Sequence, residues 1–347
     1  MNRCHSDRSD IVIPTEVILS FRPQWRNLLA KKVKKIFFVL SVVLFSVSLF
    51  AQDGENLFKH ISLVSFKNQS TYQIGKDVQT YTAARTVSPF AINKYETTYG
   101  LWYSTRIKAE KMGYVFANKG MPGSDGKVGS VPDEFNTYMP VTMINWYDAI
   151  IWCNALSESK GLTPCYSYKG EILRDSSDAR CDLASCDFTA NGYRLPTEAE
   201  WEFASRRTKY GLQAGNLASG QIDDDGRSNP ERDYQDLTWD AFNSDGARPV
   251  GISGTLFVPD TIPECGSGCA NGAGIFDMSG NVLEWCWDWF SDYNKVKGSY
   301  GPDVGLQRAA RGGSFSEYTP FIYCGDRYSY DPNEAYNYTG FRFCQSR

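Results

Sequence analysis

The feature of this sequence that most limits its fold is the scarcity of long periodic segments. From residue 52 to residue 347 most of the chain consists of short runs broken by Gly, Pro, Asn and Asp, as at 211–216, 223–230 and 263–274. No linker, repeat or low-complexity tract divides this part of the chain. Such a pattern predicts one loop-rich α+β domain of short strands, in which the irregular backbone must find partners for its polar groups.

Only two segments carry clear helix signals. Trp146 to Lys160 is one, with Asn145 as its N-cap and Gly161 as its stop. The other follows Pro196, where Thr197 and Glu200 have the spacing of a capping box. We therefore expect two helices.

The N-terminus has the order of a secretory signal peptide. A basic cluster at Lys31–Lys35 precedes an apolar run, Ile36–Phe50, which ends at Ala51. This run is shorter than the ~20 residues of a spanning helix, so a membrane anchor is the weaker alternative. We predict residues 1–51 to be an N-terminal extension and signal peptide. The rest would be exported to the cell surface, the periplasm or the medium, with no membrane span.

Charge and histidine content exclude several functions. Residues 52–347 hold 28 Lys and Arg and 37 Asp and Glu, a net charge of −9. An acidic chain of this kind does not favour nucleic-acid binding, which needs a basic face. The whole sequence has two histidines, His5 and His60, so His-based triads and multi-His metal sites are excluded.

Nine cysteines follow residue 52, and an oxidising compartment would favour disulfides among them. Cys181 and Cys186, and likewise Cys265 and Cys269, are close enough in sequence for local bridges. Spacing alone leaves the pairing open. A four-sulfur zinc site from these cysteines is disfavoured by their spacing and by export.

Six motifs in a fixed order connect the sequence to a known family. They lie at residues 88–98, 140–149, 193–202, 274–285, 311–315 and 340–342, and include Arg311-Gly312-Gly313-Ser314-Phe315 and Gly340-Phe341-Arg342. Together they resemble the formylglycine-generating enzyme family, also called the sulfatase-modifying factor family. The resemblance implies a divergent C-type lectin fold in a single domain.

The resemblance also implies a structural calcium ion. Its ligands would be Ser279, Gly280, Val282 and Glu284. Carbonyl oxygens from a tight turn with one carboxylate suit Ca²⁺. The alternative is that Glu284 is a buried hydrogen-bond acceptor.

Enzymes of the family hold copper with two cysteines that follow the Gly-Gly-Ser string. Counted along that motif, the two cysteines would fall at Glu317 and Ile322, and Cys324 is out of register. Because Cu(I) needs soft thiolate ligands, no copper is expected and the chain is predicted not to be an enzyme. The alternative is a copper-dependent formylglycine-generating oxidase.

The segment 315–339 is instead rich in tyrosine. It contains six Tyr and no Lys, Gln, Met or Trp. It is similar to the variable regions of diversity-generating retroelement proteins of the treponemal type. In those proteins, replacement of the adenines in Asn-type codons can yield Tyr, Ser, Asp, Thr, Phe or Ile, but not Lys, Gln, Met or Trp. Almost all of segment 315–339 obeys this restriction, and we take Glu317 and Glu334 as positions that do not vary.

Tyrosine with small polar residues is typical of binding surfaces. We therefore predict a ligand-binding protein whose partner is a protein or glycan on another cell or host surface. Gly312, Gly313 and Arg342 would be fixed scaffold. An undiversified envelope module is the alternative. The predicted exposed binding set is Ser316, Tyr318, Thr319, Phe321, Tyr323, Asp326, Tyr328, Tyr330, Asp331, Asn333, Tyr336, Asn337 and Tyr338.

Overall fold

The computed structural model describes residues 60–76, 82–221, 236–259, 261, 264–293, 301–318 and 320–347. All of these belong to one unit of the chain, Leu57–Arg347. The predicted signal peptide and Thr319 lie outside the described residues. No helix in the described part is both long and apolar enough to cross a membrane.

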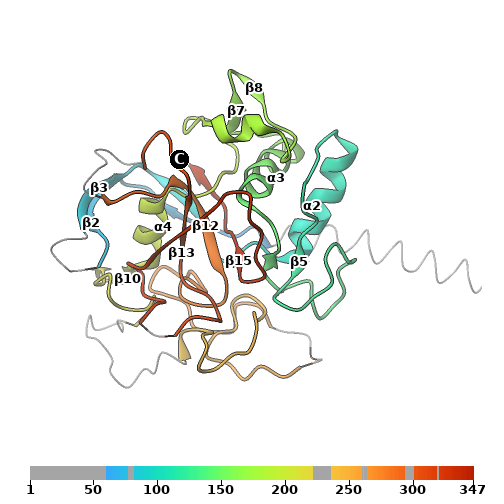
Figure 1. Ribbon diagram of the computed structural model, residues 1–347. Helices are drawn as coiled ribbons and strands as arrows, with labels where there is room; N and C mark the ends of the chain where they lie inside the picture. Colours follow the sequence, from blue (N-terminus) through green and yellow to red (C-terminus); the bar gives the residue numbers. More distant parts are fainter. Residues whose placement is uncertain are drawn as a thin grey trace, which may run out of the picture. The chain divides into compact units, whose positions relative to one another are not determined.

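Short strands and three α-helices make up the described chain (Figure 1). The helices are α2 (Tyr99–Lys111), α3 (Trp146–Ser159) and α4 (Glu198–Ser205), and η2 (Ala179–Leu183) is a 3₁₀ helix. The strands are β1 (Leu63–Phe66), β2 (Ser70–Ile74), β3 (Ala83–Val87), β4 (Phe90–Asn93), β5 (Met121–Pro122), β6 (Val141–Thr142), β7 (Tyr166–Tyr168), β8 (Glu171–Ile172), β9 (Ser185–Cys186), β10 (Arg207–Thr208), β11 (Gly211–Leu212), β12 (Leu283–Trp289), β13 (Arg308–Arg311), β14 (Arg327–Tyr330), β15 (Thr339–Gly340) and β16 (Cys344–Ser346).

Two of these helices begin where the sequence predicts. The Asn145 side chain accepts a hydrogen bond from the Asp148 amide, and the Asp148 carboxylate accepts one from the Asn145 amide, which closes a capping box on α3. Thr197 and Glu200 do the same on α4. Gly161, just past α3, has a φ of 69°, a conformation that suits glycine at a helix end.

The prediction of two helices missed α2. This helix has Thr98 as its N-cap, but Gly100 lies in its first turn. Its buried side includes the polar Thr105 and Arg106, so its sequence lacks a clean apolar stripe. The mixture of helices with short strands nevertheless confirms the α+β class.

Two sheets position the C-terminal part of the chain. The larger has the order β14-β13-β12-β15, in which β12 and β13 are antiparallel and β12 and β15 are parallel. The smaller has the order β1-β4-β16, so the last strand pairs with a strand near the start of the domain. Residues 315–339 therefore connect β13 to β15 around β14.

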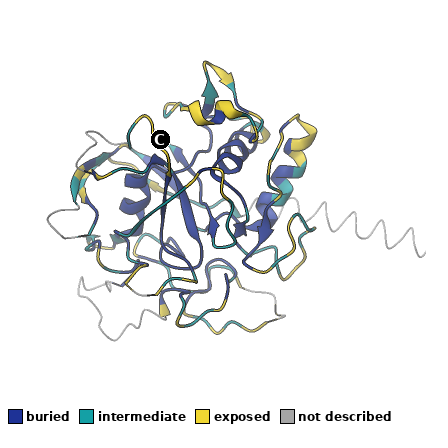
Figure 2. Cartoon of the chain, viewed as in Figure 1, coloured by how far each residue is buried: buried dark blue, intermediate teal, exposed yellow. Residues whose placement is uncertain are grey.

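Aromatic side chains fill the core on both sides of these sheets. Trp102 of α2 and Trp152 of α3 stack with centroids 6.0 Å apart, and Phe341 meets both rings edge-on. A second cluster joins Trp201 and Phe203 of α4 to β3 and β4. Figure 2 shows α4 as buried throughout and β12 as buried apart from Trp287, whereas Glu171 of β8 and the outer end of α2 are exposed.

Candidate functional site

The tyrosine-rich segment, residues 315–339, starts at a turn that only glycine can form. Gly312 and Gly313 have φ values of 97° and 69°. A Cβ added to Gly313 would lie 2.6 Å from Ile322 Cγ2, and one added to Gly312 would meet Trp201 at 3.2 Å. Positive φ and close contact together require glycine at this turn. The turn fixes the direction in which the segment leaves β13.

Glu317 closes this turn from the other side. Its Oε2 accepts hydrogen bonds from the Ser314 amide at 2.7 Å, from the Ser314 hydroxyl and from the Ser316 hydroxyl at 3.5 Å. Its backbone carbonyl accepts from the Ala241 amide at 3.0 Å. Glu317, where counting along the motif predicts the first cysteine of the family's enzymes, is therefore held in place.

The thiol nearest to this turn is buried. Ile322 and Cys324 both have no exposed surface. Cys324 Sγ lies 3.5 Å from the Ser205 carbonyl, and burial raises the pKa of this thiol to about 11. At neutral pH the thiol is protonated, which makes it a poor nucleophile and a poor metal ligand.

Three tyrosines farther along the segment form what we call the tyrosine cluster: Tyr330, Tyr336 and Tyr338. Tyr336 and Tyr338 stack with centroids 5.0 Å apart, and Tyr330 lies 5.2 Å from Tyr336. Tyr330 also meets the buried Trp285 ring edge-on at 6.1 Å. Burial raises the pKa of all three phenols, so they are neutral at physiological pH.

The backbone beneath the tyrosine cluster is fixed to the domain. The Met143 amide donates to the Tyr336 carbonyl at 2.9 Å, and the Trp146 amide at the start of α3 donates to the Pro332 carbonyl at 3.1 Å. The Leu283 amide of β12 donates to the Tyr338 carbonyl at 2.9 Å. The loop 331–338 is thus anchored through its carbonyl groups, and its tyrosine side chains remain half-buried.

A second aromatic contact lies near the start of the segment. Tyr318 meets Phe242 edge-on with centroids 5.0 Å apart, and the exposed fractions of these side chains are 54% and 62%. Phe321 is 55% exposed, and its carbonyl accepts a hydrogen bond from the Tyr328 hydroxyl. Exposed aromatic side chains at this spacing provide apolar contact area for a partner.

The exposed set is smaller than the sequence predicts. Of the thirteen residues in that set, Ser316, Tyr318, Phe321, Asp331 and Asn333 are exposed. The others that the structure describes are half-buried because each packs against or hydrogen-bonds to the domain: Tyr323, Asp326, Tyr328, Tyr330, Tyr336, Asn337 and Tyr338. Asn337, for example, donates to the Ser124 carbonyl at 3.1 Å.

Asp326 and Tyr323 belong to the fixed part of the segment. Asp326 forms an ion pair with Lys76 and accepts from the Tyr323 amide at 2.9 Å. The Lys76 ammonium also lies 5.3 Å from the centre of the Tyr323 ring. These contacts tie the segment to the stretch that follows β2, which the sequence pattern did not indicate.

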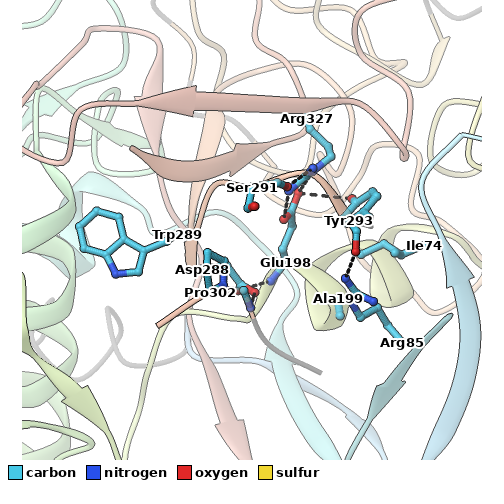
Figure 3. A pocket seen from close by; sticks show the side chains of 11 residues that line it. Ile74, Arg85, Glu198, Ala199, Asp288, Trp289, Ser291, Tyr293, Pro302 and Arg327 are labelled. Carbon is cyan, nitrogen blue, oxygen red and sulfur yellow. Dashed lines mark hydrogen bonds and ion pairs between the residues drawn. The ribbon is translucent and has the colours of Figure 1, made fainter. Parts of the chain in front are cut away.

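The base of β14 is held by a buried ion pair (Figure 3). Arg327 reaches both oxygens of Glu198 on α4, with an Nη2–Oε2 distance of 2.7 Å, and donates to the Ser291 carbonyl at 2.8 Å. Its guanidinium lies over the Tyr293 ring, 3.9 Å from the ring centre. Burial alone would raise the pKa of Glu198, but Arg327 and Arg311 outweigh it and lower that pKa.

Asp288 lies beside this ion pair. It accepts from the Glu198 amide at 2.7 Å and from the Gly301 amide at 2.6 Å. Burial, and then the charge of Glu198, raise the pKa of Asp288 to about 7. The cavity among these side chains holds about 10 Å³, room for one water molecule. This polar network supports the segment and offers no space for a larger ligand.

Of the four residues predicted to hold calcium, Ser279, Gly280 and Val282 lie in the turn before β12, and Glu284 lies in β12 itself. Glu284 is fully buried, and its two oxygens accept from Arg342 Nε and Nη2, both at 2.6 Å. Trp201 Nε1 also donates to Glu284 at 2.7 Å. Ser279 Oγ accepts from the Ser219 amide at 3.0 Å. Gly280 and Val282 are buried in the same turn.

This arrangement does not fit the predicted calcium site, because Arg342 already neutralises the only carboxylate in the set. Within the described residues no three His, Cys, Asp or Glu side chains are grouped so that they could hold a metal ion.

The nine cysteines from Cys153 onward are free thiols, without the local bridges at Cys181/Cys186 and Cys265/Cys269.

The sequence reasoning missed Phe242, Lys76 and the role of Glu198. Phe242 and Lys76 meet the segment only in the folded chain, and no pattern around them indicates it. Glu198 had a usable signal, since it is an acidic residue that directly follows an N-cap and becomes almost fully buried. A buried carboxylate requires a cation, and the tyrosine-rich segment contains one arginine, Arg327.

Known proteins resemble this chain in sequence and in fold. Residues 63–347 match the family described as sulfatase-modifying factor enzyme 1-like domain. The chaperone protein LppX of Paenibacillus barcinonensis is 33% identical over 217 residues, 59% of this chain and 64% of that protein. The formylglycine-generating enzyme of Bos taurus is 27% identical over 305 residues, 84% of this chain and 68% of that protein.

Among solved structures, Treponema denticola variable protein 1 matches with a TM-score of 0.60 and 28% identity, over 82% of this chain and 95% of that chain. Neighbours of this kind confirm the C-type-lectin-like α+β fold and the likeness to retroelement variable proteins. The family includes formylglycine-generating enzymes, so membership alone does not decide between catalysis and binding. From residue 63 to its last residue, the chain belongs to the formylglycine-generating enzyme, or sulfatase-modifying factor, family.

Proposed function

We propose that this chain is an exported, non-catalytic ligand-binding protein whose tyrosine-rich segment forms the binding surface. One observation carries the proposal: the backbone of the segment is anchored at both ends, while its aromatic side chains keep exposed surface. Tyr318 and Phe321 are more than half exposed, while Arg327 fixes β14 within the segment and Arg342 fixes the chain just after it. Tyrosine gives a large contact area at low entropic cost, which suits a binding surface.

The binding proposal can be tested without knowing the partner. Wild-type protein and the triple variant Tyr318→Ala, Tyr336→Ala, Tyr338→Ala would be screened against a displayed random-peptide library and a glycan array. We expect the wild type to retain specific members and the triple variant to retain none. The two proteins should have Tm values within ~5 °C, since none of these three side chains is fully buried. Equal retention by both proteins would contradict the proposal.

The likeness to Treponema denticola variable protein 1 supports a further part of this proposal, that segment 315–339 is diversified by a retroelement. Sequencing the gene and its neighbourhood across many cells tests this directly. A nearby near-copy of the DNA encoding the segment, differing at adenines, is the expected result. An invariant 3′ end without such a copy would leave a binding or envelope module of fixed specificity.

Family membership keeps one catalytic alternative open, a copper-dependent oxidase that converts a sulfatase cysteine to formylglycine. The buried, protonated Cys324 and the hydrogen-bonded Glu317 give copper no pair of thiolates here. We expect no aldehyde when the protein is incubated with copper and a sulfatase-type cysteine peptide. Aldehyde formation that is lost in Cys324→Ser would overturn the non-catalytic proposal.

A further inference from the structure

A second cavity lies outside the tyrosine-rich segment. Its volume is about 240 Å³, compared with about 10 Å³ for the cavity beside Glu198. The residues that line it come from the end of β3 and the turn after it, from the stretch 188–200, and from Ser346 and Arg347, and none lies within 315–339. Sites for drug-sized ligands hold about 300–1,000 Å³, so this cavity suits a smaller molecule, about the size of one ring.

The floor of this cavity is a buried ion pair. Arg194 and Glu200 are 2% and 5% exposed, and Arg194 Nη1 and Nη2 each lie 2.7 Å from an oxygen of Glu200. The Thr197 amide donates to the same carboxylate at 2.9 Å. Because the guanidinium and the carboxylate neutralise each other, the floor offers polar atoms without a net charge. A charged ligand would have to compete with this pairing, so a neutral ligand is favoured.

Hydroxyl groups line the cavity together with the ion pair. Ser346 Oγ accepts a hydrogen bond from Arg194 Nε at 3.1 Å, and this contact does not use the hydroxyl hydrogen of Ser346. Thr189 Oγ1 donates to Asp187 at 2.6 Å, and this contact does not use the lone pairs of Thr189. Ser88 is exposed at the rim. The cavity therefore presents uncharged groups that can both donate and accept hydrogen bonds.

Apolar side chains complete the lining. Val87 and Pro89 contribute to it together with Phe188, which is half-buried. The Arg194 guanidinium lies 4.8 Å from the centre of the Phe188 ring, and this contact holds the ring against the domain. Apolar surface beside hydroxyl groups matches a small ring that has C–H faces and polar edges.

The backbone around the cavity is fixed. The Arg347 amide donates to the Pro89 carbonyl at 3.0 Å. Arg194 and Cys344 exchange two backbone hydrogen bonds, at 3.0 Å and 2.7 Å. Segments that are far apart in the sequence are therefore tied together around the cavity. A ligand would not have to order them when it binds.

From this lining we propose that the cavity binds a neutral polyhydroxylated ring, a single sugar residue. Its hydroxyl groups would exchange hydrogen bonds with Ser346, with Thr189 and with the ion pair, and its C–H face would lie against Phe188. A free monosaccharide and the terminal residue of a glycan chain share this chemistry. The inference does not depend on the binding function proposed for the tyrosine-rich segment, because the two sites have no residue in common.

The test measures the binding of sugars to the full chain by isothermal titration calorimetry. The probes are glucose, galactose, mannose and N-acetylglucosamine, each also as its methyl glycoside, with glucuronate and inorganic phosphate as charged probes. Ser88→Tyr places a large side chain at the rim, and Ser346→Ala removes one hydroxyl group from the lining. The control Ser65→Tyr makes the larger change at an exposed serine of β1 that does not line the cavity. Thermal unfolding scans confirm that each variant is folded.

We expect at least one neutral sugar to bind the wild type. Its affinity should fall at least about tenfold in Ser88→Tyr and about fivefold in Ser346→Ala, the factor expected for one hydrogen bond. Ser65→Tyr should stay within about twofold of the wild type. A methyl glycoside that binds as well as its parent sugar would identify the end of a glycan as the ligand, and loss of binding on methylation would identify the free sugar.

The inference is refuted by any of three results. The first is that no neutral sugar binds the wild type at about 10 mM. The second is equal affinity in Ser88→Tyr and Ser65→Tyr, because the sugar would then bind elsewhere on the protein. The third is binding of glucuronate or phosphate alone, which would show that the cavity takes an anion. None of these results bears on the function proposed for the tyrosine-rich segment.

Discussion

At the scale of single residues, Arg327 holds the base of the tyrosine-rich segment. Its ion pair with Glu198 is buried, and side-chain exposures are 15% and 5%. Breaking such a pair leaves an uncompensated charge away from water. We expect Arg327→Met to lower the free energy of unfolding by about 3–5 kcal/mol, measured by urea denaturation.

Arg180 provides the matched control for that measurement. It pairs with Glu171 on the surface, where the exposed fractions are 47% and 77%. Exposed pairs of this kind contribute about 0–1 kcal/mol. Arg180→Met should therefore leave the free energy of unfolding almost unchanged. Similar losses in both variants would show that the Arg327 ion pair has no special structural role.

Asp288 gives a second residue-scale prediction, on pH. Its pKa in the folded protein is about 7, raised from an ordinary value of 3.8 by burial and then by Glu198. Between these two values the folded state binds more protons than the unfolded state, so this carboxyl lowers stability as pH rises from about 4 to about 7. Where the carboxyl is protonated in the folded state and ionised in the unfolded state, the free energy of unfolding falls by about 1.4 kcal/mol per pH unit.

Urea denaturation at several pH values from 4.5 to 7.5 would isolate this contribution. We expect Asp288→Asn to flatten the fall in stability over that range, relative to the wild type. Asp245→Asn is the control, because Asp245 is exposed and its pKa is lowered by the hydrogen bond from Arg248, so it does not titrate in this range. An unchanged slope in Asp288→Asn would show that another group is responsible.

At the scale of elements, the segment combines structural and displayed tyrosines. Tyr330 on β14 packs against the buried Trp285, whereas Tyr318 is 54% exposed and contacts only the exposed Phe242 among the rings described. We expect Tyr330→Ala to lower the free energy of unfolding by about 1–2 kcal/mol and Tyr318→Ala by less than about 0.5 kcal/mol. Equal losses in urea denaturation would mean that the segment is either wholly core or wholly surface.

The elements also show what could be predicted from the sequence. The starts of α3 and α4 follow from Asn145 and Thr197, since a capping side chain acts on amides two or three residues away. Helix α2 could not be found in this way, because Thr105 and Arg106 are buried and only the tertiary fold determines that. Long-range contacts such as Arg327 with Glu198, 129 residues apart, carry no local signal.

At the scale of the whole molecule, the motifs predicted the family and the fold class, because each motif has a demanding local geometry. Gly313, for example, needs a positive φ next to Ile322. The predicted exposure of the binding set was less accurate, since the exposure of Tyr323 or Asn337 depends on residues outside the segment. The calcium ligands were predicted from motif position alone, and the partner of Glu284 is Arg342, which lies between β15 and β16.

The ion pair between Glu284 and Arg342 leads to a prediction for the intact protein. Because this carboxylate is already neutralised, removal of calcium with EGTA should shift Tm by less than about 1 °C. A thermal unfolding scan with EGTA, with added Ca²⁺ and with added Mg²⁺ measures this. A fall of several degrees that Ca²⁺ alone reverses would show that calcium displaces Arg342 from Glu284.

The place of β16 in the sheet has a consequence for how the gene can change. This strand pairs with β4, and Arg342 just before it reaches back to Glu284, so the final residues complete the fold after the tyrosine-rich segment has been made. A substitution inside the segment leaves that closure intact. An insertion or deletion that shifts the reading frame replaces Arg342 and β16 with unrelated sequence. Frameshifted copies would lack the residues that close the fold, so a folded protein requires that changes in the segment keep the reading frame.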